Sequence, residues 1–565
     1  MDIKQYVAEL LQPAIDSDIA LSTIKNTLEE PKHDDHGDLA FPCFILAAKL
    51  RQAPAKIAQD LAAKLKDPMI DEVEVVGPYI NFFFNRGKMS SEVLKYILTA
   101  KTNYGRQDLG QGRQVPIDMS SPNIAKPMSM GHLRSTVIGN AIGNILEAVG
   151  FEPVRINHLG DWGTQFGKLI VAYRLWGTED KIKAEPIQEL LRLYVKFHQE
   201  AEHDPKLEDT GREAFKALED GAPEETRLWK WFREESLEEF NKTYKKLGIE
   251  FDSYAGESFY NDKMEAIVQE LKDKNLLKRD QGAEIVDLSQ YDLNPALIKK
   301  SDGATLYMTR DLAAAEYRKK TYNFYESLYV VGSEQANHFK QLKAVLKEMG
   351  HEWSEDIHHI AFGLVTKDGE KLSTRKGKVV LLEEVLNEAI SLSKKQIEEK
   401  NPELENKEEV ARAVGTGAVI FFDLRNDRRN SYDFNLQEIT HFEGETGPYV
   451  QYANVRCHSI LSKAEQNGQQ AEVAAMSKMS DEAFAIVKTL HNYPDTILRA
   501  YREFEPSVIS KYLLALAQNF NRYYAHTRIL SDDQGLHHRL ALVKAVSLVL
   551  TSGLKILGIQ APEKM

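Results

Sequence analysis

The chain has 565 residues, of which 72 are Lys or Arg and 85 are Asp or Glu, so its formal net charge is −13. Hydrophobic residues make up 42% and charged residues 28%, which is usual for a globular protein and excludes long disordered stretches. The length predicts several domains, because a single hydrophobic core rarely serves more than about 300 residues. The acidic balance argues against nonspecific coating of nucleic acid, although a local basic strip would suffice for a specific partner.

Two further features predict a cytoplasmic protein with no structural metal. No stretch reaches the roughly 18 apolar residues of a membrane helix, and acidic residues take the place of a long apolar run at the start. The 2 cysteines, Cys43 and Cys457, are too few and too far apart for a thiolate zinc site or a disulfide framework. We therefore expect no zinc and no membrane contact.

Residues 1–105 predict an α+β domain that stands by itself. Apolar residues recur at helical spacing in Tyr6–Ile15 and again in Phe41–Leu65. The valine- and aromatic-rich segment Val73–Phe84 predicts strand, which Gly77-Pro78 interrupts with a turn.

A strand–loop–helix–strand unit follows, as at the start of a nucleotide-binding parallel sheet. Val115–Ser120 predicts a strand, Gly131–Val149 a helix and Phe151–Ile156 the next strand. Residues from about 172 to 280 are mostly helical in pattern and highly charged, which indicates a helical insertion.

The alternation of strands and helices then resumes. Strands are predicted at Ala283–Leu288, Ala304–Met308, Ser327–Val331 and His358–Leu364, with helices from Asp311 and at Ala336–Met349. From Leu382 onward the pattern is almost purely helical. The predicted fold class is α/β: an N-terminal α+β domain (1–105), a Rossmann-like parallel-sheet domain with a helical insertion (106–380), a helical connecting region (381–440) and an all-α helical bundle (441–565).

The first segment with chemical character is Ser120–Thr136, SSPNIAKPMSMGHLRST. A helix N-terminus presents unpaired N–H groups and the positive end of the helix dipole, which suits a phosphate group. Gly131 allows close approach of the backbone, and Lys126 and His132 add hydrogen-bond donors. Taken alone, a Gly-His pair behind a serine is more often an ordinary capped helix than a binding site.

The second segment, Lys367–Val380, reads KDGEKLSTRKGKVV. Its basic residues crowd around a Lys-Asp-Gly turn and a Ser-Thr pair, directly after the last predicted strand of the sheet. A mobile cationic loop in that place would suit a polyphosphate. Taken alone, a solvated basic hairpin would be the simpler explanation.

Together the two segments resemble the signature motifs of class I aminoacyl-tRNA synthetases, usually written His-Ile-Gly-His and Lys-Met-Ser-Lys-Ser. Here they read Ser129-Met130-Gly131-His132 and Lys371-Leu372-Ser373-Thr374-Arg375. The flanking segments are similar to arginyl-tRNA synthetases, in the same order and over almost the whole chain: LGDWGTQFG (159–167), LYMTRDLAAA (306–315), GSEQANHFKQL (332–342), ETGPYVQYANVR (445–456) and LGIQAPEKM (557–565).

The resemblance implies which residues handle ATP. The implied catalytic residues are Lys126, His132, Lys371, Ser373 and Arg375. The implied ATP-binding loop comprises Pro122, Asn123, Ile124, Ala125, Lys126, Pro127, Met128, Ser129, Met130, Gly131 and His132. Ser129 stands where the first signature has a histidine and Thr374 where the second has a lysine. The family is thought to rely on an upstream lysine, here Lys126, and Lys376 is a further candidate.

Recognition of an arginine side chain requires carboxylates and other acceptors that match a planar guanidinium. The implied arginine-binding residues are Asp118, Asn123, His132, Tyr307, Asp311 and Gln341. Asp118 ends the first predicted strand, and Tyr307 and Asp311 are four residues apart, so they could lie side by side. By resemblance, Asn123 would hold the amino or carboxylate end of the substrate. A helix N-cap is the alternative role for Asp311.

In the last predicted domain, Tyr449, Tyr452 and Arg456 recur at helical spacing, which places two aromatic rings and a cation on one face. Unstacked anticodon bases are read by such stacking and by hydrogen bonds to base edges. A tyrosine-rich bundle core would give the same pattern. The resemblance favours anticodon binding, with Tyr524, Arg528 and Met565 as weaker candidates for the same surface.

The resemblance implies the activity of an arginine–tRNA ligase. The arginine carboxylate would attack the α-phosphorus of ATP and expel pyrophosphate, and the 3′-terminal ribose of tRNA(Arg) would then accept the arginyl group. Mg²⁺ is expected to arrive with ATP, not to be held in a protein cage. A monomer is expected. The alternatives are another class I synthetase or a small-molecule adenylyltransferase of the same fold, and a noncatalytic tRNA-binding paralogue, which would lack the phosphate-handling residues.

Overall fold

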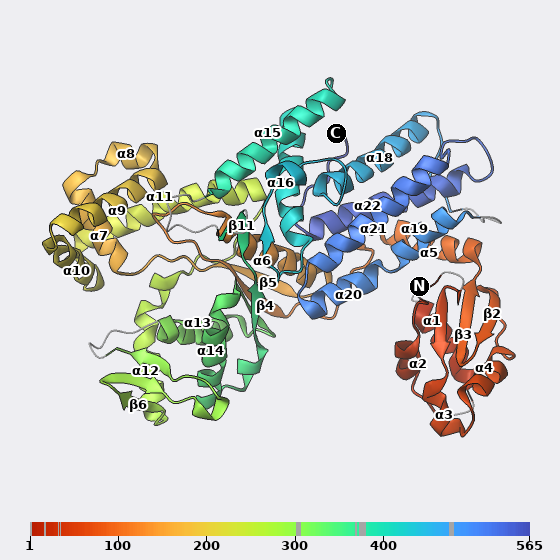
Figure 1. Cartoon of the computed structure of the whole chain (residues 1–565), viewed down its shortest axis with the longest axis horizontal. Helices are drawn as coiled ribbons and strands as arrows, with labels where there is room; N and C mark the ends of the chain where they lie inside the picture. Colours follow the sequence, from red (N-terminus) through yellow and green to blue (C-terminus); the bar gives the residue numbers. More distant parts are fainter. Residues whose placement is uncertain are drawn as a thin grey trace. The chain divides into compact units, whose positions relative to one another are not determined.

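The computed structural model describes residues 3–15, 18–31, 33, 36–300, 307–367, 370–371, 380–473 and 479–565. The chain forms two compact units (Figure 1). The first comprises Met1–Tyr104, Arg456–Tyr493 and Ala515–Val549, and the second comprises Gly105–Val455, Pro494–Leu514 and Leu550–Met565. The first break in the chain therefore follows Tyr104, next to the predicted limit at residue 105.

The N-terminal part of the first unit is an antiparallel sheet with helices. Its elements are α1 (Ile3–Ala14), α2 (Leu21–Thr27), β1 (Leu39–Pro42), α3 (Phe44–Leu50), α4 (Pro54–Ala62), β2 (Ile70–Val76), β3 (Tyr79–Phe84) and α5 (Arg86–Ala100). The strand order is β1-β3-β2. The predicted turn at Gly77-Pro78 lies between β2 and β3. Strand β1 was missed, because its four residues are too few to show an alternating pattern.

The second unit contains the predicted parallel sheet. Its strands are β4 (Gln114–Ser120), β5 (Glu152–Asn157), β9 (Ser327–Gly332) and β10 (Ile357–Phe362), in the order β10-β9-β4-β5 and parallel throughout. Strand β4 is buried along six of its seven residues, as expected for a strand with both faces covered. The chain moves outward in one direction from β4 to β5 and in the other from β9 to β10. In such sheets, ligands bind beyond the carboxyl ends of the central strands.

Helix α6 (Met130–Ala148) packs on β4, β5 and β9 and brings its N-terminus to that edge (Figure 1). Gly139 makes the close packing possible, because a Cβ there would lie 2.1 Å from the Cβ of Met119. The helix ends just before Gly150, whose φ of 89° only glycine adopts readily.

Helices fill the predicted insertion between β5 and β9. They are α7 (Thr164–Trp176), α8 (Glu179–Ala184), α9 (Pro186–His203), α10 (Lys206–Glu219), α11 (Pro223–Leu247) and α12 (Met264–Asp273). An antiparallel sheet of β6 (Leu277–Asp280), β7 (Ala283–Val286) and β8 (Ala296–Lys299) follows them. Of these strands the sequence predicted only β7, because β6 is mostly polar and exposed and β8 has only four residues.

Helices α13 (Tyr307–Tyr322) and α14 (Ala336–Glu348) flank β9 in the chain. Tyr307 and Met308 were predicted as the end of a strand, and this was wrong: both lie in α13, whose alanine-rich sequence favours helix. The rest of that predicted strand, 304–306, lies outside the described residues. Asp311 lies inside α13, so its alternative role as an N-cap was also wrong.

The C-terminal part is helical, as predicted. It comprises α15 (Leu382–Lys400), α16 (Lys407–Leu424), α17 (Leu436–Ile439), α18 (Gly447–Gln466), α19 (Asp481–His491), α20 (Tyr493–Glu503), α21 (Ser507–His526) and α22 (Leu536–Ile556). A small sheet in the order β12-β11-β13 accompanies them, made of β11 (Val365–Lys367), β12 (Glu370–Lys371) and β13 (Tyr432–Asp433).

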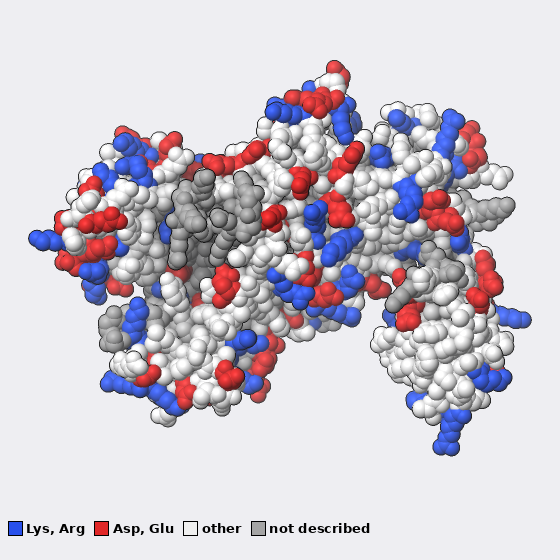
Figure 2. All heavy atoms as spheres, in the orientation of Figure 1, with Lys and Arg blue, Asp and Glu red and all other residues white. Residues whose placement is uncertain are grey.

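Among the residues that the structure describes, no helix is both long and apolar enough to cross a bilayer. On the face drawn in Figure 2, acidic and basic side chains are interspersed, without a broad basic surface. A negatively charged partner would therefore have to bind on that face through individual basic side chains, because the face as a whole is not positively charged.

Candidate active site

The loop before α6 is held by backbone contacts at the carboxyl edge of the sheet. Ile124 N donates to Gly160 O at 3.2 Å, and Gly160 N donates to Pro122 O at 3.0 Å. A Cβ on Gly160 would lie 2.2 Å from the side-chain oxygen of Asn123, so only glycine fits beside that amide. These contacts place Asn123, which is exposed, next to the turn that follows β5.

Ala125 is the bend of this loop. Its φ is 63°, and its N–H donates to Ser236 Oγ at 3.0 Å. Ser236 lies on α11, so the insertion helps to shape the loop. Lys126 follows immediately, and its ammonium lies 5.4 Å from the ring centre of Tyr194 on α9. Lys126 is half-buried and therefore remains partly accessible.

His132 is oriented by the residue that precedes α6. The backbone N–H of Ser129 donates to His132 Nδ1 at 3.0 Å, and the Ser129 hydroxyl lies 3.1 Å from the same atom. Since Nδ1 accepts a hydrogen bond, the neutral ring carries its proton on Nε2 and can donate it. Burial lowers the pKa of His132, which favours this neutral form.

The structure brings the end of the second signature segment to the first. Ser129 and Leu381 form an isolated antiparallel bridge. Met130 N donates to Val380 O at 3.3 Å, and Leu382 N donates to Met128 O at 3.0 Å. The start of the same segment forms a hairpin, in which Thr366 pairs with Lys371 and Lys367 with Glu370. The residues that end and follow the second segment, Val380 and Leu381, thus lie against the residues that begin α6.

Several of the predicted catalytic side chains lie outside the described residues. These are Ser373 and Arg375, together with Thr374 and Lys376. For Lys371 the backbone is described in β12, but the side chain is not. Their roles stay predictions.

Asp118 lies at the carboxyl end of β4, as predicted, but it already has a partner. Arg318 Nη2 lies 2.8 Å from Asp118 Oδ2, and both side chains are buried. The hydroxyl of the buried Tyr329 has no hydrogen-bond partner among the described residues. Burial raises the pKa of Tyr329 to about 12; Arg318 opposes this rise, and the charges of Asp118 and Asp311 contribute to it. The Arg318 guanidinium lies 4.9 Å from the ring centre of Tyr329.

The other predicted arginine-binding residues come from α13 and α14. Asp311 Oδ2 lies 2.5 Å from His338 Nε2. Tyr307 is 69% exposed at the start of α13, one helical turn before Asp311, so the spacing does place them on the same face. Gln341 donates to the backbone oxygens of Asn294 at 2.9 Å and of Pro295 at 3.2 Å. The side-chain amide of Gln341 is therefore already hydrogen-bonded to the protein backbone.

The predicted anticodon-binding residues fall into two groups with separate contacts. Tyr452 and Met565 pack against one hydrophobic cluster, which includes Val414 and Phe442. The Arg456 guanidinium lies 4.7 Å from the ring centre of Tyr524, which is 43% exposed. Tyr449 is half-buried on α18. Part of this tyrosine-rich pattern is therefore packing, as the alternative explanation held.

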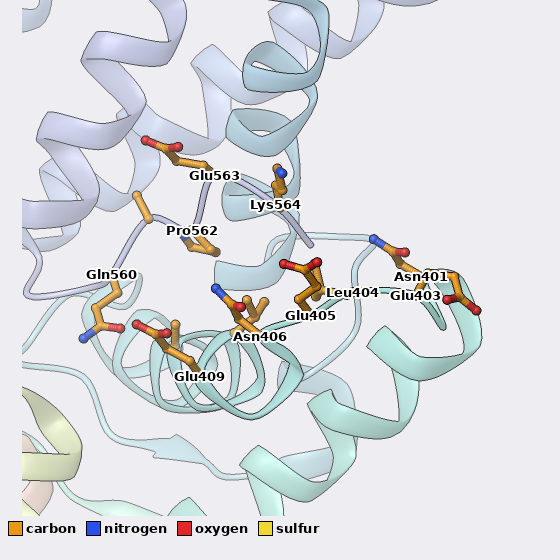
Figure 3. Close-up of a pocket in the computed structure, with 13 residues that line it drawn as sticks. Asn401, Glu403, Leu404, Glu405, Asn406, Glu409, Gln560, Pro562, Glu563 and Lys564 are labelled. Atoms are coloured by element: carbon orange, nitrogen blue, oxygen red, sulfur yellow. The ribbon is translucent and has the colours of Figure 1, made fainter. Parts of the chain in front are cut away.

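A pocket of about 660 Å³ lies beside the Tyr452–Met565 cluster (Figure 3). Eight residues between 401 and 413 and the C-terminal segment 560–564 line it, and Leu404 and Val410 belong to both the pocket and the cluster. The carboxylates of Glu405 and Glu409 are on its wall. They would repel a polyphosphate, so this pocket does not suit ATP.

Four residues near the site were not singled out from the sequence. Three of them were described above. Ser236 accepts a hydrogen bond from the Ala125 N–H. His338 contacts Asp311, and Arg318 pairs with Asp118. Arg134 on α6 is almost fully buried and contacts the backbone before β11. Arg134 and His338 lie inside segments that carry the resemblance, which was the only signal that could have found them.

Three family models match successive parts of the chain. They are described as Arginyl tRNA synthetase N terminal domain (residues 1–84), tRNA synthetases class I (R), catalytic domain (93–436) and DALR anticodon binding domain (450–565). The arginine–tRNA ligases of Enterococcus faecalis and Latilactobacillus sakei are each 58% identical to the chain, over 100% of both proteins. The solved arginyl-tRNA synthetase of Thermus thermophilus is 28% identical with a TM-score of 0.80, again over 100% of both chains.

Proposed function

This chain belongs to the arginyl-tRNA synthetase family of class I, and we propose that it activates L-arginine with ATP and transfers the arginyl group to the 3′-terminal ribose of tRNA(Arg). It is an enzyme of the arginine–tRNA ligase type, with a Rossmann-like catalytic domain and a helical anticodon-binding domain in one chain. The observation that carries the proposal from the chain's own geometry is the bridge between Ser129 and Leu381, which joins the two signature segments.

The first step needs position and charge neutralisation, not a covalent nucleophile. The arginine carboxylate attacks the α-phosphorus in line, and the pyrophosphate departs with charge on its oxygens. We assign His132 Nε2–H and the N-terminus of α6 to the α-phosphate. We assign Lys371, Ser373 and Arg375 to the pyrophosphate, with Lys126 in place of the lysine that Thr374 replaces.

We propose that Mg²⁺ enters with the triphosphate, whose oxygens are the hard ligands that this ion prefers. Asp118 and Asp311, the carboxylates assigned to the site, are consistent with this, because Asp118 is engaged by Arg318 and Asp311 by His338. After the reaction, Mg²⁺ would leave with pyrophosphate. The same proposal includes a monomeric protein in the cytoplasm that requires no zinc.

We assign arginine selection to Asp118, Asp311 and Tyr307, with Asn123 at the amino or carboxylate end. In the described structure Arg318 holds one oxygen of Asp118, so a substrate guanidinium would join a carboxylate that is already oriented. An amino acid without the guanidinium would leave the remaining acceptor sites of these carboxylates without a donor, which gives strong rejection.

The decisive experiment is aminoacylation of total tRNA with each of the twenty labelled amino acids. We expect charging with arginine alone. Charging with another amino acid would contradict the substrate, and no charging at all would favour the noncatalytic alternative. The family resemblance also implies that arginine-dependent ATP–pyrophosphate exchange needs tRNA, and equal exchange rates with and without tRNA would contradict that.

A further inference from the structure

Arg134 is the most completely enclosed charge close to His132. It lies on α6, two residues after His132, and 1% of it is exposed. Burying a guanidinium is costly unless its donors are all occupied. The hydrogen bonds of this side chain therefore show which parts of the fold it joins.

The Arg134 guanidinium holds two segments of backbone. Nη1 donates to Gly363 O at 2.8 Å and to Asn430 O at 2.9 Å, and Nη2 donates to Arg428 O at 3.2 Å. Gly363 precedes β11, and Asn430 precedes β13. A planar guanidinium is suited to this task, because its donors leave in fixed directions toward several acceptors at once.

The carboxyl group of Asp423 on α16 faces the Arg134 guanidinium. Arg134 Nε lies 3.1 Å from Asp423 Oδ2, and the Tyr432 hydroxyl donates to the same oxygen at 2.6 Å. The guanidinium also lies 4.9 Å from the ring centre of Tyr432. Tyr432 belongs to β13, so this contact ties the same strand a second time.

The contacts of Arg134 with the residues before β11 and β13 are linked to β12 through strand pairing. Strand β13 pairs with β11 through Val365 and Tyr432, and β11 pairs with β12 through Thr366 and Lys371. The path from Arg134 to Lys371 is thus a short series of backbone hydrogen bonds. At the other end of the signature segment, the bridge from Leu381 to Ser129 returns to the start of the same helix.

We propose that Arg134 is a positioning residue for ATP activation: it anchors the strands that present Lys371 to the helix that presents His132. The two groups that act on opposite ends of the triphosphate are then fixed to one element. This inference rests on the proposed function, because it takes the roles of His132 and Lys371 from there.

The test is a double-mutant cycle in tRNA-dependent ATP–pyrophosphate exchange. Arg134→Lys keeps the charge but loses the fork that reaches the three backbone carbonyls. We expect it to lower kcat/KM for ATP at least tenfold, with less than a twofold change in KM for arginine and in tRNA affinity. In a Lys371→Ala background, Arg134→Lys should have less than a twofold further effect, because a positioning residue acts through the group that it positions.

A matched control is Arg539→Lys in the other unit. Arg539 also holds backbone oxygens of a turn, of Ile529 at 2.8 Å and of Ser531 at 2.6 Å, and pairs with Asp533. It should leave kcat/KM for ATP unchanged. If Arg134→Lys does not fold, Tyr432→Phe serves instead, since it removes only the hydroxyl that Asp423 accepts. It should lower kcat/KM for ATP about threefold in the wild-type background only.

The proposal is overturned if folded Arg134→Lys or Tyr432→Phe has wild-type kinetics, or if its loss is undiminished in the Lys371→Ala background. A Lys371→Ala enzyme with wild-type ATP kinetics would overturn the role given to Lys371, and this proposal with it. Arginine charging by the wild-type protein would still support the proposed function in that case, so the two failures are distinguishable.

Discussion

His132 Nδ1 accepts a hydrogen bond at 3.0 Å from the backbone N–H of Ser129, the residue that stands where the first signature has a histidine. The replacement thus keeps a local partner for the remaining histidine. Because this donor belongs to the backbone, any residue other than proline would retain it, whereas the contact of Nδ1 with the Ser129 hydroxyl requires a serine or a similar side chain.

This arrangement predicts the pH dependence of adenylate formation. Burial places the pKa of His132 below 6.5 in the folded protein, so protonation on acidification puts a proton on Nδ1, opposite the Ser129 N–H. We expect kcat/KM for ATP to be constant at pH 6.5 and just above, and to decrease only at pH values below 6.5. His132→Gln should be slower but lack this decline. A midpoint above 6.5, or a decline that persists in His132→Gln, would contradict the assignment.

The lowered pKa of His132 also makes the free energy of unfolding depend on pH. Since the folded pKa of His132 is lower than the unfolded value of 6.5, the unfolded chain binds the proton more readily. The contribution of His132 to stability is therefore complete above pH 6.5 and decreases as the pH falls toward the folded pKa. Denaturant titrations of wild type and His132→Gln over this range would show the difference as a convergence at low pH.

Lys371→Ala tests the pyrophosphate end of the site. We expect adenylate formation to slow at least tenfold, which corresponds to about 1.4 kcal/mol of barrier, because one cation facing the departing charge is lost. Affinity for tRNA should hardly change. Pre-steady-state adenylate formation and a filter-binding assay measure the two quantities, and an unaltered adenylation rate would refute the role.

The buried pair Asp118–Arg318 predicts a large effect on stability. Arg318→Met leaves an uncompensated carboxylate in the core and should cost about 3 to 5 kcal/mol of unfolding free energy. The control is Lys56→Met, which breaks an exposed i,i+4 pair with Asp60 at 2.8 Å and should change little. Denaturant unfolding compares the two variants, and equal losses would show that Arg318 contributes no more than a surface lysine.

Asp311→Asn tests arginine recognition. Loss of the charge opposite the guanidinium should raise KM for arginine at least tenfold, about 1.4 kcal/mol, and leave KM for ATP near wild type. Glu316→Gln is a matched control on the same helix, because Glu316 also pairs with a histidine, His351 at 3.1 Å. If both variants change KM for arginine alike, the effect belongs to α13 as a whole and not to Asp311.

Tyr449→Ala tests the anticodon surface. Loss of a base-stacking ring costs about 1 to 3 kcal/mol, so KM for tRNA should rise roughly five- to 150-fold. Tyr449→Phe keeps the ring and should stay within a few-fold of wild type. ATP affinity, measured without tRNA, should be the same in all three proteins. A wild-type KM for tRNA in Tyr449→Ala would place this side chain outside the interface.

The sequence predicted the parallel strands β4, β5, β9 and β10 to within two residues at every end, because apolar residues recur in each of them and turn residues bound them. It also placed α6 and its N-terminal loop correctly. It failed at β1, β6 and β8, which are too short for a periodic pattern, and at Tyr307 and Met308, where helix continues into a segment that resembled a strand.

The order of motifs along the chain, through their resemblance to a known family, therefore determined the kind of protein: the two signature segments, the segments that flank them and the tyrosines near the C-terminus are all visible in the sequence. Only the tertiary structure decided their partners. Arg318 with Asp118, His338 with Asp311, and Arg134 with Gly363 join residues from 27 to 229 positions apart. Such pairs follow from packing against the sheet, and no local pattern encodes which distant side chain will fill the space beside a given charge.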